Sequence, residues 1–185
     1  MSEAPSVLRF SRDEYHRLGE IGMIRPETRT ELLDGVIYEM APIGPGHAWP
    51  TTRLQRRLER CAGDAAILMV QQPLALSGDS EPVPDLMLLR ADADDRRQPE
   101  PPDVLLLIEV SVTTLAYDRV TKAARYAAAG IPDCWVHVVA TRQFIVHREP
   151  SLRGYADVRT YEAGQPIAPL ALPDCPIDPG NLAGT

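Results

Sequence analysis

The sequence predicts an α/β (α+β) fold, in which about three helices pack on a mixed β-sheet of roughly five to eight strands. Residues 103–110 form an almost continuous apolar run, which is typical of a strand that is covered by helices on both faces and lies centrally in its sheet. The alanine-rich residues 117–129 have strong helix propensity, and Gly130 closes this helix. Asp34-Gly35 links two short apolar segments, which is a strong hairpin signal.

Two further helices are predicted before the central strand. Ser11 and Glu14 form a capping-box pattern, so a short helix begins there and ends near Gly19 or Gly22. Residues 47–62 carry apolar side chains at near-helical spacing, which predicts a second helix. Its apolar positions are Trp49, Leu54, Leu58 and Cys61, and its other face carries Arg53, Arg56, Arg57 and Arg60. These arginines are interpreted as a solvated face or, alternatively, as contacts to phosphate groups.

The remaining strands are predicted from short apolar runs between turn residues. Glu31 lies on the first strand of the Asp-Gly hairpin, close to the turn. Residues 134–139 and 143–147 form a second hairpin, and the acidic, proline-rich residues 91–102 form a connecting loop. Further strands are predicted at residues 66–70, 73–76 and 83–89, with edge strands at residues 156–161 and 167–172.

Composition predicts one globular domain over residues 1–185. With 44% hydrophobic and 24% charged residues, the chain is neither disordered nor fibrous. Its apolar runs are far shorter than the roughly 20 residues that cross a bilayer, and its first residues lack the pattern of a secretory signal, so a cytoplasmic location is expected. The net charge of −7 disfavours a protein that coats nucleic acid, although it leaves open an enzyme with a local basic groove.

The cysteines give no sign of a metal site. Cys61, Cys134 and Cys175 lie far apart in the sequence, without a C-x-x-C pair and without a histidine at zinc-ligand spacing. We expect all three to be reduced and buried.

Two carboxylates and one lysine are the candidate chemical groups. Asp85 and Glu109 interrupt the two most apolar strands, and buried carboxylates need a cation beside them. Two carboxylates and a backbone carbonyl are enough protein ligands for Mg²⁺, because this ion keeps several of its waters. Lys122 is the only lysine among 19 basic residues, and it lies on the helix after the Glu109 strand, where it could orient or deprotonate a water that attacks a phosphodiester. The alternative is a surface i, i+4 ion pair between Asp118 and Lys122.

In their order and spacing, these residues resemble the Uma2 family of restriction-type endonucleases, within the PD-(D/E)XK nuclease superfamily. The resemblance runs from about Glu14 to Arg148, which is most of the chain. The segments that carry it are Glu31-Leu32-Leu33-Asp34-Gly35, His47, Pro84-Asp85, Ile108-Glu109-Val110-Ser111, Thr113-Thr114, Asp118, Lys122, Tyr126, Gly130-Ile131-Pro132 and Cys134-Trp135-Val136.

The resemblance implies a restriction-endonuclease-like core over about residues 14–148, with a Pro/Gly-rich C-terminal extension at residues 150–185. It also implies an endonuclease that hydrolyses DNA phosphodiester bonds with Mg²⁺ or Mn²⁺ as cofactor. By this likeness the metal is held by Asp85, Glu109 and the carbonyl of Val110, the catalytic lysine is Lys122, and the early acidic residue, which reaches the site directly or through water, is Glu31. His47 matches a further family position of less defined role.

The chain departs from the superfamily pattern at one position. A lysine normally stands two residues after the second acid, and here that residue is Ser111. The likeness is therefore to the subgroup in which the lysine has moved to the following helix, where this chain has Lys122.

Other functions are also compatible with these residues. A catalytically degenerate DNA- or protein-binding module of the same fold is the main alternative, because a fold does not secure an activity. A carboxylate-pair glycosidase is disfavoured, because the sequence lacks the aromatic platforms that bind sugars. DNA is the expected partner, and no interaction with a membrane is expected. One active site cuts one strand, so double-strand cleavage needs a homodimer or two sequential events.

Overall fold

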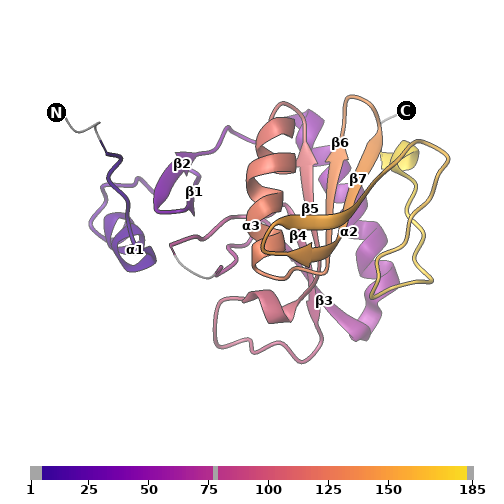
Figure 1. Ribbon diagram of the computed structural model, residues 1–185, viewed down its shortest axis with the longest axis horizontal. Coiled ribbons are helices and arrows are strands. Elements are labelled where there is room, and N and C mark those ends of the chain that lie inside the picture. The colour runs from indigo at the N-terminus through magenta and orange to yellow at the C-terminus, as the bar shows by residue number, and fades with distance from the viewer. Residues whose placement is uncertain (1–5, 77–78, 183–185) are drawn as a thin grey trace.

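A six-stranded sheet forms the centre of the molecule. The structure, a computed structural model, describes residues 6–76 and 79–182 (Figure 1). The strands follow the order β3-β4-β5-β6-β7-β8, and within this sheet only β5 and β6 are parallel neighbours. The strands are β3 (Ala66–Val70), β4 (Leu86–Arg90), β5 (Val104–Ser111), β6 (Asp133–Val138), β7 (Gln143–Ser151) and β8 (Gly154–Tyr161). The predicted mixed sheet, with the most apolar strand near its centre, is confirmed.

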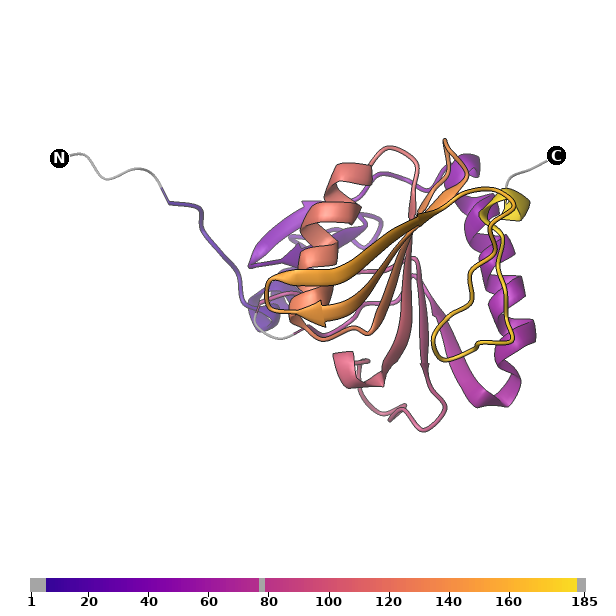
Figure 2. The same cartoon turned by 45° about the vertical axis from the view of Figure 1, so that its right-hand side comes forward.

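Helices cover both faces of this sheet. Helix α2 (Pro45–Ala62) lies on one side, and α3 (Ala123–Ala128) lies on the other (Figure 2). Neighbouring side chains of a strand point to opposite faces of the sheet, so the core has one part on the side of α2 and another on the side of α3. Leu86 and Ile108 pack with α2, whereas Met87 and Leu107 pack with Tyr126 of α3. Within the described ranges, no helix combines the length and the apolar character that a membrane span requires.

The parallel pair β5 and β6 is joined through the helical segment that ends in α3, as parallel strands require a crossover. This segment does not begin as a regular α-helix. Tyr117–Lys122 forms a π-helix, called η3, in which hydrogen bonds span five residues, and the chain continues from it directly into α3. The predicted helix is therefore present, and Gly130 ends it with a φ of 81°.

The N-terminal elements lie beside the sheet. Helix α1 (Arg12–Glu20) has the predicted capping box at Ser11 and buries no residue of its own. Strands β1 (Thr30–Leu33) and β2 (Val36–Glu39) form the predicted hairpin as a separate two-stranded sheet. Asp34 and Gly35 have φ values of 50° and 75°, as a tight two-residue turn of this kind requires. An ion pair between Asp34 and Arg125 ties this turn to α3.

Three local predictions are wrong. Residues 73–76 do not form a strand, because the N–H groups of Leu74 and Ala75 bond to carbonyls of loop residues rather than to a neighbouring strand. Residues 167–172 form only one isolated bridge, between Ile167 and Ile177. Trp49 is 62% exposed, because it lies about 140° around α2 from the buried Leu54 and so points away from the sheet.

The prediction of three reduced cysteines is also wrong. Cys61, at the end of α2, forms a disulfide with Cys175, and their Cα atoms are 5.7 Å apart. The C-terminal extension folds back along α2, which brings together two residues that are separated by 114 positions. Cys134 is buried with a free thiol, as predicted.

Candidate active site

A pocket of about 470 Å³ opens where the β1–β2 hairpin, the start of α2, the adjacent ends of β4 and β5, and the π-helical segment meet. Its polar lining residues come from all of these elements. They are Arg29, Glu31, Tyr38, Glu39, His47, Asp85, Glu109, Thr113, Thr114, Tyr117, Asp118 and Lys122. The structure therefore brings together every residue that was singled out from the sequence as a candidate catalytic or metal-binding residue, including Val110.

Asp85 and Glu109 are placed side by side by the pairing of β4 with β5. Met87 lies opposite Leu107 in this antiparallel pair, so two residues further along each strand Asp85 faces Glu109 on the same side of the sheet. The carboxylate of Asp85 is held at both oxygens. Its Oδ2 accepts a hydrogen bond of 2.8 Å from the N–H of Val110, and its Oδ1 lies 3.0 Å from Nε2 of His47.

Lys122 points into the pocket and is only 2% exposed. Its Nζ lies 3.0 Å from Oε2 of Glu31 and 3.0 Å from Oε1 of Glu109. The alternative of a surface ion pair with Asp118 is thereby excluded, since both side chains are buried. Burial opposes the charge of the ammonium group, but the carboxylates of Glu109 and Glu31 outweigh it and raise the pKa of Lys122. Lys122 is therefore a cation at neutral pH.

Glu31 is fixed by three donors. Besides Lys122, the N–H of Val83 donates to Oε2 over 3.1 Å, and the hydroxyl of Tyr117 donates to Oε1 over 3.0 Å. Tyr117 and Lys122 are the first and last residues of the π-helix. In an α-helix, residues five positions apart point about 140° away from each other. The wider π turn lets both side chains reach the same carboxylate.

Glu109 is a second buried acid of the pocket. Its Oε1 accepts a short hydrogen bond of 2.6 Å from the hydroxyl of Tyr126, in addition to its contact with Lys122. Burial raises the pKa of Glu109 to about 8; Lys122 lowers it in part, and the neighbouring charge of Asp85 raises it further. Burial likewise raises the pKa of Asp118. Four buried carboxyl groups thus line a pocket that holds one buried lysine. A further cation would relieve the burial and crowding that raise the pKa values of Glu109 and Asp118.

The donor set fits a hard divalent cation. Among the described residues, no three side chains of the types His, Cys, Asp and Glu lie in an arrangement that could hold a metal ion. The side-chain donors available are therefore the paired carboxylates of Asp85 and Glu109, with oxygen from the backbone and water for the rest. Mg²⁺ is bound in this way in many proteins, because it prefers oxygen ligands and keeps several of its waters. The chemistry of the pocket is thus that of two acids beside a fixed cationic lysine.

Comparisons with known proteins identify the family and the fold of the chain. The Uma2 family, described as "Putative restriction endonuclease", matches residues 12–179. The chain belongs to the Uma2 family. A search of curated proteins found no match. A crystal structure described as "a putative nuclease belonging to DUF820", from Anabaena variabilis, is similar with a TM-score of 0.74 at 14% sequence identity, covering 94% of this chain and 97% of the other.

These comparisons confirm the predicted family and the predicted fold. The structural neighbour shares the arrangement of helices and sheet over nearly the whole chain, and its low sequence identity limits the likeness to the fold. The family description supports a nuclease-like function for this Uma2 chain.

Sequence reasoning missed two tyrosines of this Uma2 site. Tyr117 was not singled out, because α-helical periodicity does not place it beside Lys122. Tyr126 was noted only as part of the family resemblance, and its hydrogen bond to Glu109 appears only in the tertiary structure. The one signal in the sequence was the presence of tyrosines on the same helix as the sole lysine.

Proposed function

We propose that this Uma2 chain is a metal-dependent endonuclease that hydrolyses DNA phosphodiester bonds, and that the pocket around Lys122 is its active site. The observation that supports the proposal most is the convergence of Asp85, Glu109 and Lys122 from three elements into one pocket. Carboxylates with a cationic lysine are what the hydrolysis of a phosphodiester requires, because negative charge develops on the phosphate oxygens and on the leaving oxygen.

Asp85, Glu109 and the carbonyl of Val110 would hold Mg²⁺ or Mn²⁺. When bound, the ion stabilises the charge on the phosphate and lowers the pKa of a coordinated water. The chain's own contribution is to fix the donors. His47 and the N–H of Val110 orient Asp85, and Tyr126 orients Glu109.

Lys122 would act as a hydrogen-bond donor and a fixed positive charge rather than as a general base. Its neighbours Glu31 and Glu109 raise the pKa of the ammonium group, so it does not lose a proton near neutral pH. An ammonium group donates hydrogen bonds, and here it would orient the attacking water and offset the charge of the scissile phosphate. Glu31 and Tyr117 would keep it in place.

A catalytically degenerate binding module of the same fold is a second candidate. The observation that favours it is the complete engagement of Lys122, which is 2% exposed and already contacts two carboxylates. In that case the cluster would have a structural role, and nucleic acid or protein would bind without being cut.

Cleavage of supercoiled plasmid distinguishes the two candidates. We expect the wild-type protein to nick or linearise the plasmid with Mg²⁺ or Mn²⁺ and to leave it intact with EDTA. Asp85→Asn and Lys122→Met should each abolish cleavage, whereas Arg153→Ala, at an exposed turn position, should retain it. Single-stranded DNA and RNA substrates test the choice of substrate. A homodimer would be supported by two results together: linear plasmid that accumulates without a preceding nicked form, and a dimer in sedimentation.

Metal binding is measured separately from activity. Calorimetric titration with Mn²⁺ should give binding to the wild-type protein and to Lys122→Met, but not to Asp85→Asn. If Mn²⁺ binds and none of the substrates is cut, the degenerate module becomes the better description. If Asp85→Asn cuts and binds Mn²⁺ like the wild type, the proposed metal site is wrong.

A further inference from the structure

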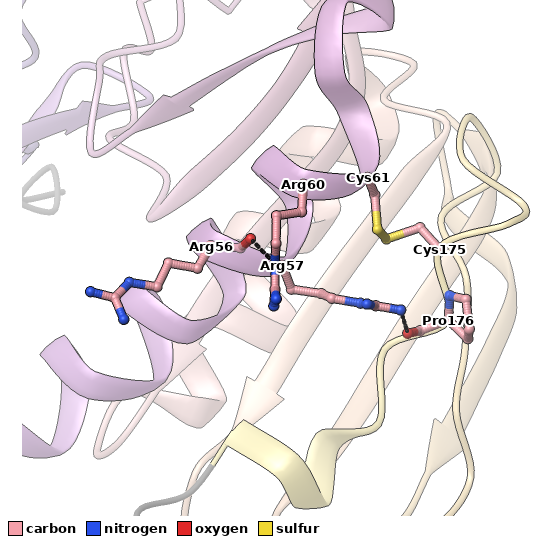
Figure 3. The surroundings of a disulfide bond; sticks show 6 residues. All are labelled: Arg56, Arg57, Arg60, Cys61, Cys175 and Pro176. Carbon is pink, nitrogen blue, oxygen red and sulfur yellow. Dashed lines mark hydrogen bonds between the residues drawn. A yellow bond between two sulfur atoms is a disulfide. The ribbon is translucent and has the colours of Figure 1, made fainter.

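A second cleft, of about 600 Å³, lies between α2 and the folded-back C-terminal extension. One wall is the face of α2 that carries Arg53, Arg56, Arg57 and Arg60, and the opposite wall includes Pro176 and Ile177. Figure 3 shows these elements at the point where the Cys61–Cys175 disulfide joins them. We call this feature the arginine cleft.

The four arginines of the cleft have no carboxylate partner, whereas several arginines elsewhere in the described chain do. Arg90 pairs with Asp92, and Arg148 pairs with Asp133, within 3 Å in each case. In the described part of the chain, no carboxylate lies within 4 Å of a guanidinium of the arginine cleft, so none of its four arginines is in an ion pair. One carboxylate, that of Asp178, also lines the cleft, and its Oδ1 accepts hydrogen bonds from the N–H groups of Gly164 and Gly180. The four arginines give the cleft a local excess of positive charge in a chain whose net charge is −7.

Two of these arginines build the cleft, and two remain available. Arg53 donates to the carbonyl of Leu182 over 3.0 Å. Arg57 donates to the carbonyl of Pro176, also over 3.0 Å (Figure 3), so both arginines fasten the C-terminal extension to α2. Arg56 and Arg60 are exposed; the one interaction between them is a bond from Nε of Arg60 to the carbonyl of Arg56, within their own helix. Their guanidinium ends are therefore free to bind a ligand.

The cleft suits phosphate groups that are joined in a chain. Guanidinium groups bind phosphate oxygens through two parallel hydrogen bonds. About 6 Å of helix axis separates Arg56 from Arg60, so their two guanidinium groups can contact two successive phosphates of a strand. No aromatic side chain is among the described residues that line the cleft, so no aromatic ring there would stack on a nucleobase. This favours a backbone over a free nucleotide.

We propose that the arginine cleft binds the phosphate backbone of nucleic acid, at a site separate from the pocket around Lys122. The choice of nucleic acid as the ligand rests on the proposed nuclease function. The pocket around Lys122 carries an excess of acidic groups, so it contributes little long-range attraction for a polyanion. The arginine cleft supplies that attraction, and the disulfide holds its two walls together.

The test is binding of a fluorescein-labelled 24-base-pair duplex, measured by anisotropy in EDTA at several salt concentrations. The Arg56→Gln/Arg60→Gln variant should bind roughly tenfold more weakly at low salt, and the slope of log affinity against log salt should fall by about 2. The control variant Arg142→Gln/Arg153→Gln removes the same charge from exposed arginines outside the cleft and should bind like the wild type. Melting curves must show that both variants are folded.

Three outcomes overturn the proposal: wild-type protein that does not bind the duplex, an unchanged salt slope in Arg56→Gln/Arg60→Gln, or an equal loss in the control variant. Displacement of the duplex by micromolar inorganic phosphate would also overturn it, because it would indicate a site for a small anion. The binding assay separates this proposal from the nuclease function, because it is run in EDTA, where no metal-dependent cleavage takes place. Plasmid cleavage by Arg142→Gln/Arg153→Gln is measured beside it, so failure of cleavage and failure of the cleft give different results.

Discussion

The ammonium group of Lys122 lies 3.0 Å from the carboxylate of Glu31, and both side chains are almost completely buried. Lys122 lies on the π-helix after the central strand, and Glu31 lies on a separate hairpin. Their contact holds the hairpin against the main sheet and fixes the only lysine of the chain at the candidate active site. Stability and chemistry therefore depend on the same ion pair, and variants at these positions must be examined for both.

Lys122→Met should lower the free energy of unfolding by about 3 kcal/mol at pH 8, because it leaves Glu31 and Glu109 buried without their cation. Without the lysine, the pKa of Glu109 in the folded protein rises still further above its value in the unfolded chain. The folded protein then binds a proton that the unfolded chain does not. The loss should therefore be smaller at pH 5 than at pH 8. Urea unfolding at the two pH values measures it, and an equal loss at both would contradict this account.

The π-helix can be removed by deleting one residue. Val120 is 64% exposed and lies between Tyr117 and Lys122, so its deletion should leave a regular α-helix and retain the far-ultraviolet circular dichroism of the protein. In the shortened α-helix, Tyr117 and Lys122 would stand four positions apart on one face, so both could still reach Glu31, and we expect cleavage to be retained. Val120→Ala is the matched control, which should behave like the wild type. A deletion variant that is folded but does not cut would contradict this account.

Tyr126→Phe removes the donor to Oε1 of Glu109 without changing the packing of the ring. The buried bond should contribute about 1–2 kcal/mol to the free energy of unfolding. Tyr117→Phe, whose hydroxyl is only partly buried, should cost less. Thermal or urea unfolding of the two variants gives the comparison, and a larger cost for Tyr117→Phe would reverse the order of importance assigned here.

The disulfide predicts how many cysteine thiols of the denatured protein react before and after reduction. Denatured but unreduced protein should show one reactive thiol, from Cys134, and three after reduction. Cys61→Ser should lower the free energy of unfolding by about 2–5 kcal/mol, because the lost cross-link no longer restricts the unfolded chain. Three thiols before reduction would show that the cysteines are not joined in solution.

His137 should make the protein less stable in acid. Burial lowers the pKa of this imidazole to about 4, from the usual value near 6.5. Between these values the unfolded chain binds a proton that the folded chain does not, so stability falls as the pH is lowered through this window, by about 3 kcal/mol in total. His137→Gln should show a smaller fall from pH 7 to pH 4 in chemical unfolding. Equal pH dependence in both proteins would exclude this histidine as the cause.

Local chemistry determined much of the fold. The Asp-Gly turn, the capping box at Ser11 and Gly130 at the end of a helix each act within a few residues, and all three appear as predicted. The apolar run of β5 predicted that this strand lies near the centre of the sheet, since a strand that is apolar along most of its length must be covered on both faces. The strand predicted at residues 73–76 is absent, because an apolar run does not specify which partner its backbone will bond.

By itself the sequence predicted which residues would carry the chemistry: two acids in apolar strands, one lysine on the next helix, and an early glutamate beside a turn. Only the tertiary structure decided how they meet. The register of β4 against β5 sets Asp85 facing Glu109, and the π turn brings Tyr117 and Lys122 to one carboxylate. Likewise, Cys61 and Cys175 become neighbours only when the C-terminal extension folds back along α2. Such contacts join segments far apart in the chain, and the pattern of residues along one segment does not specify them.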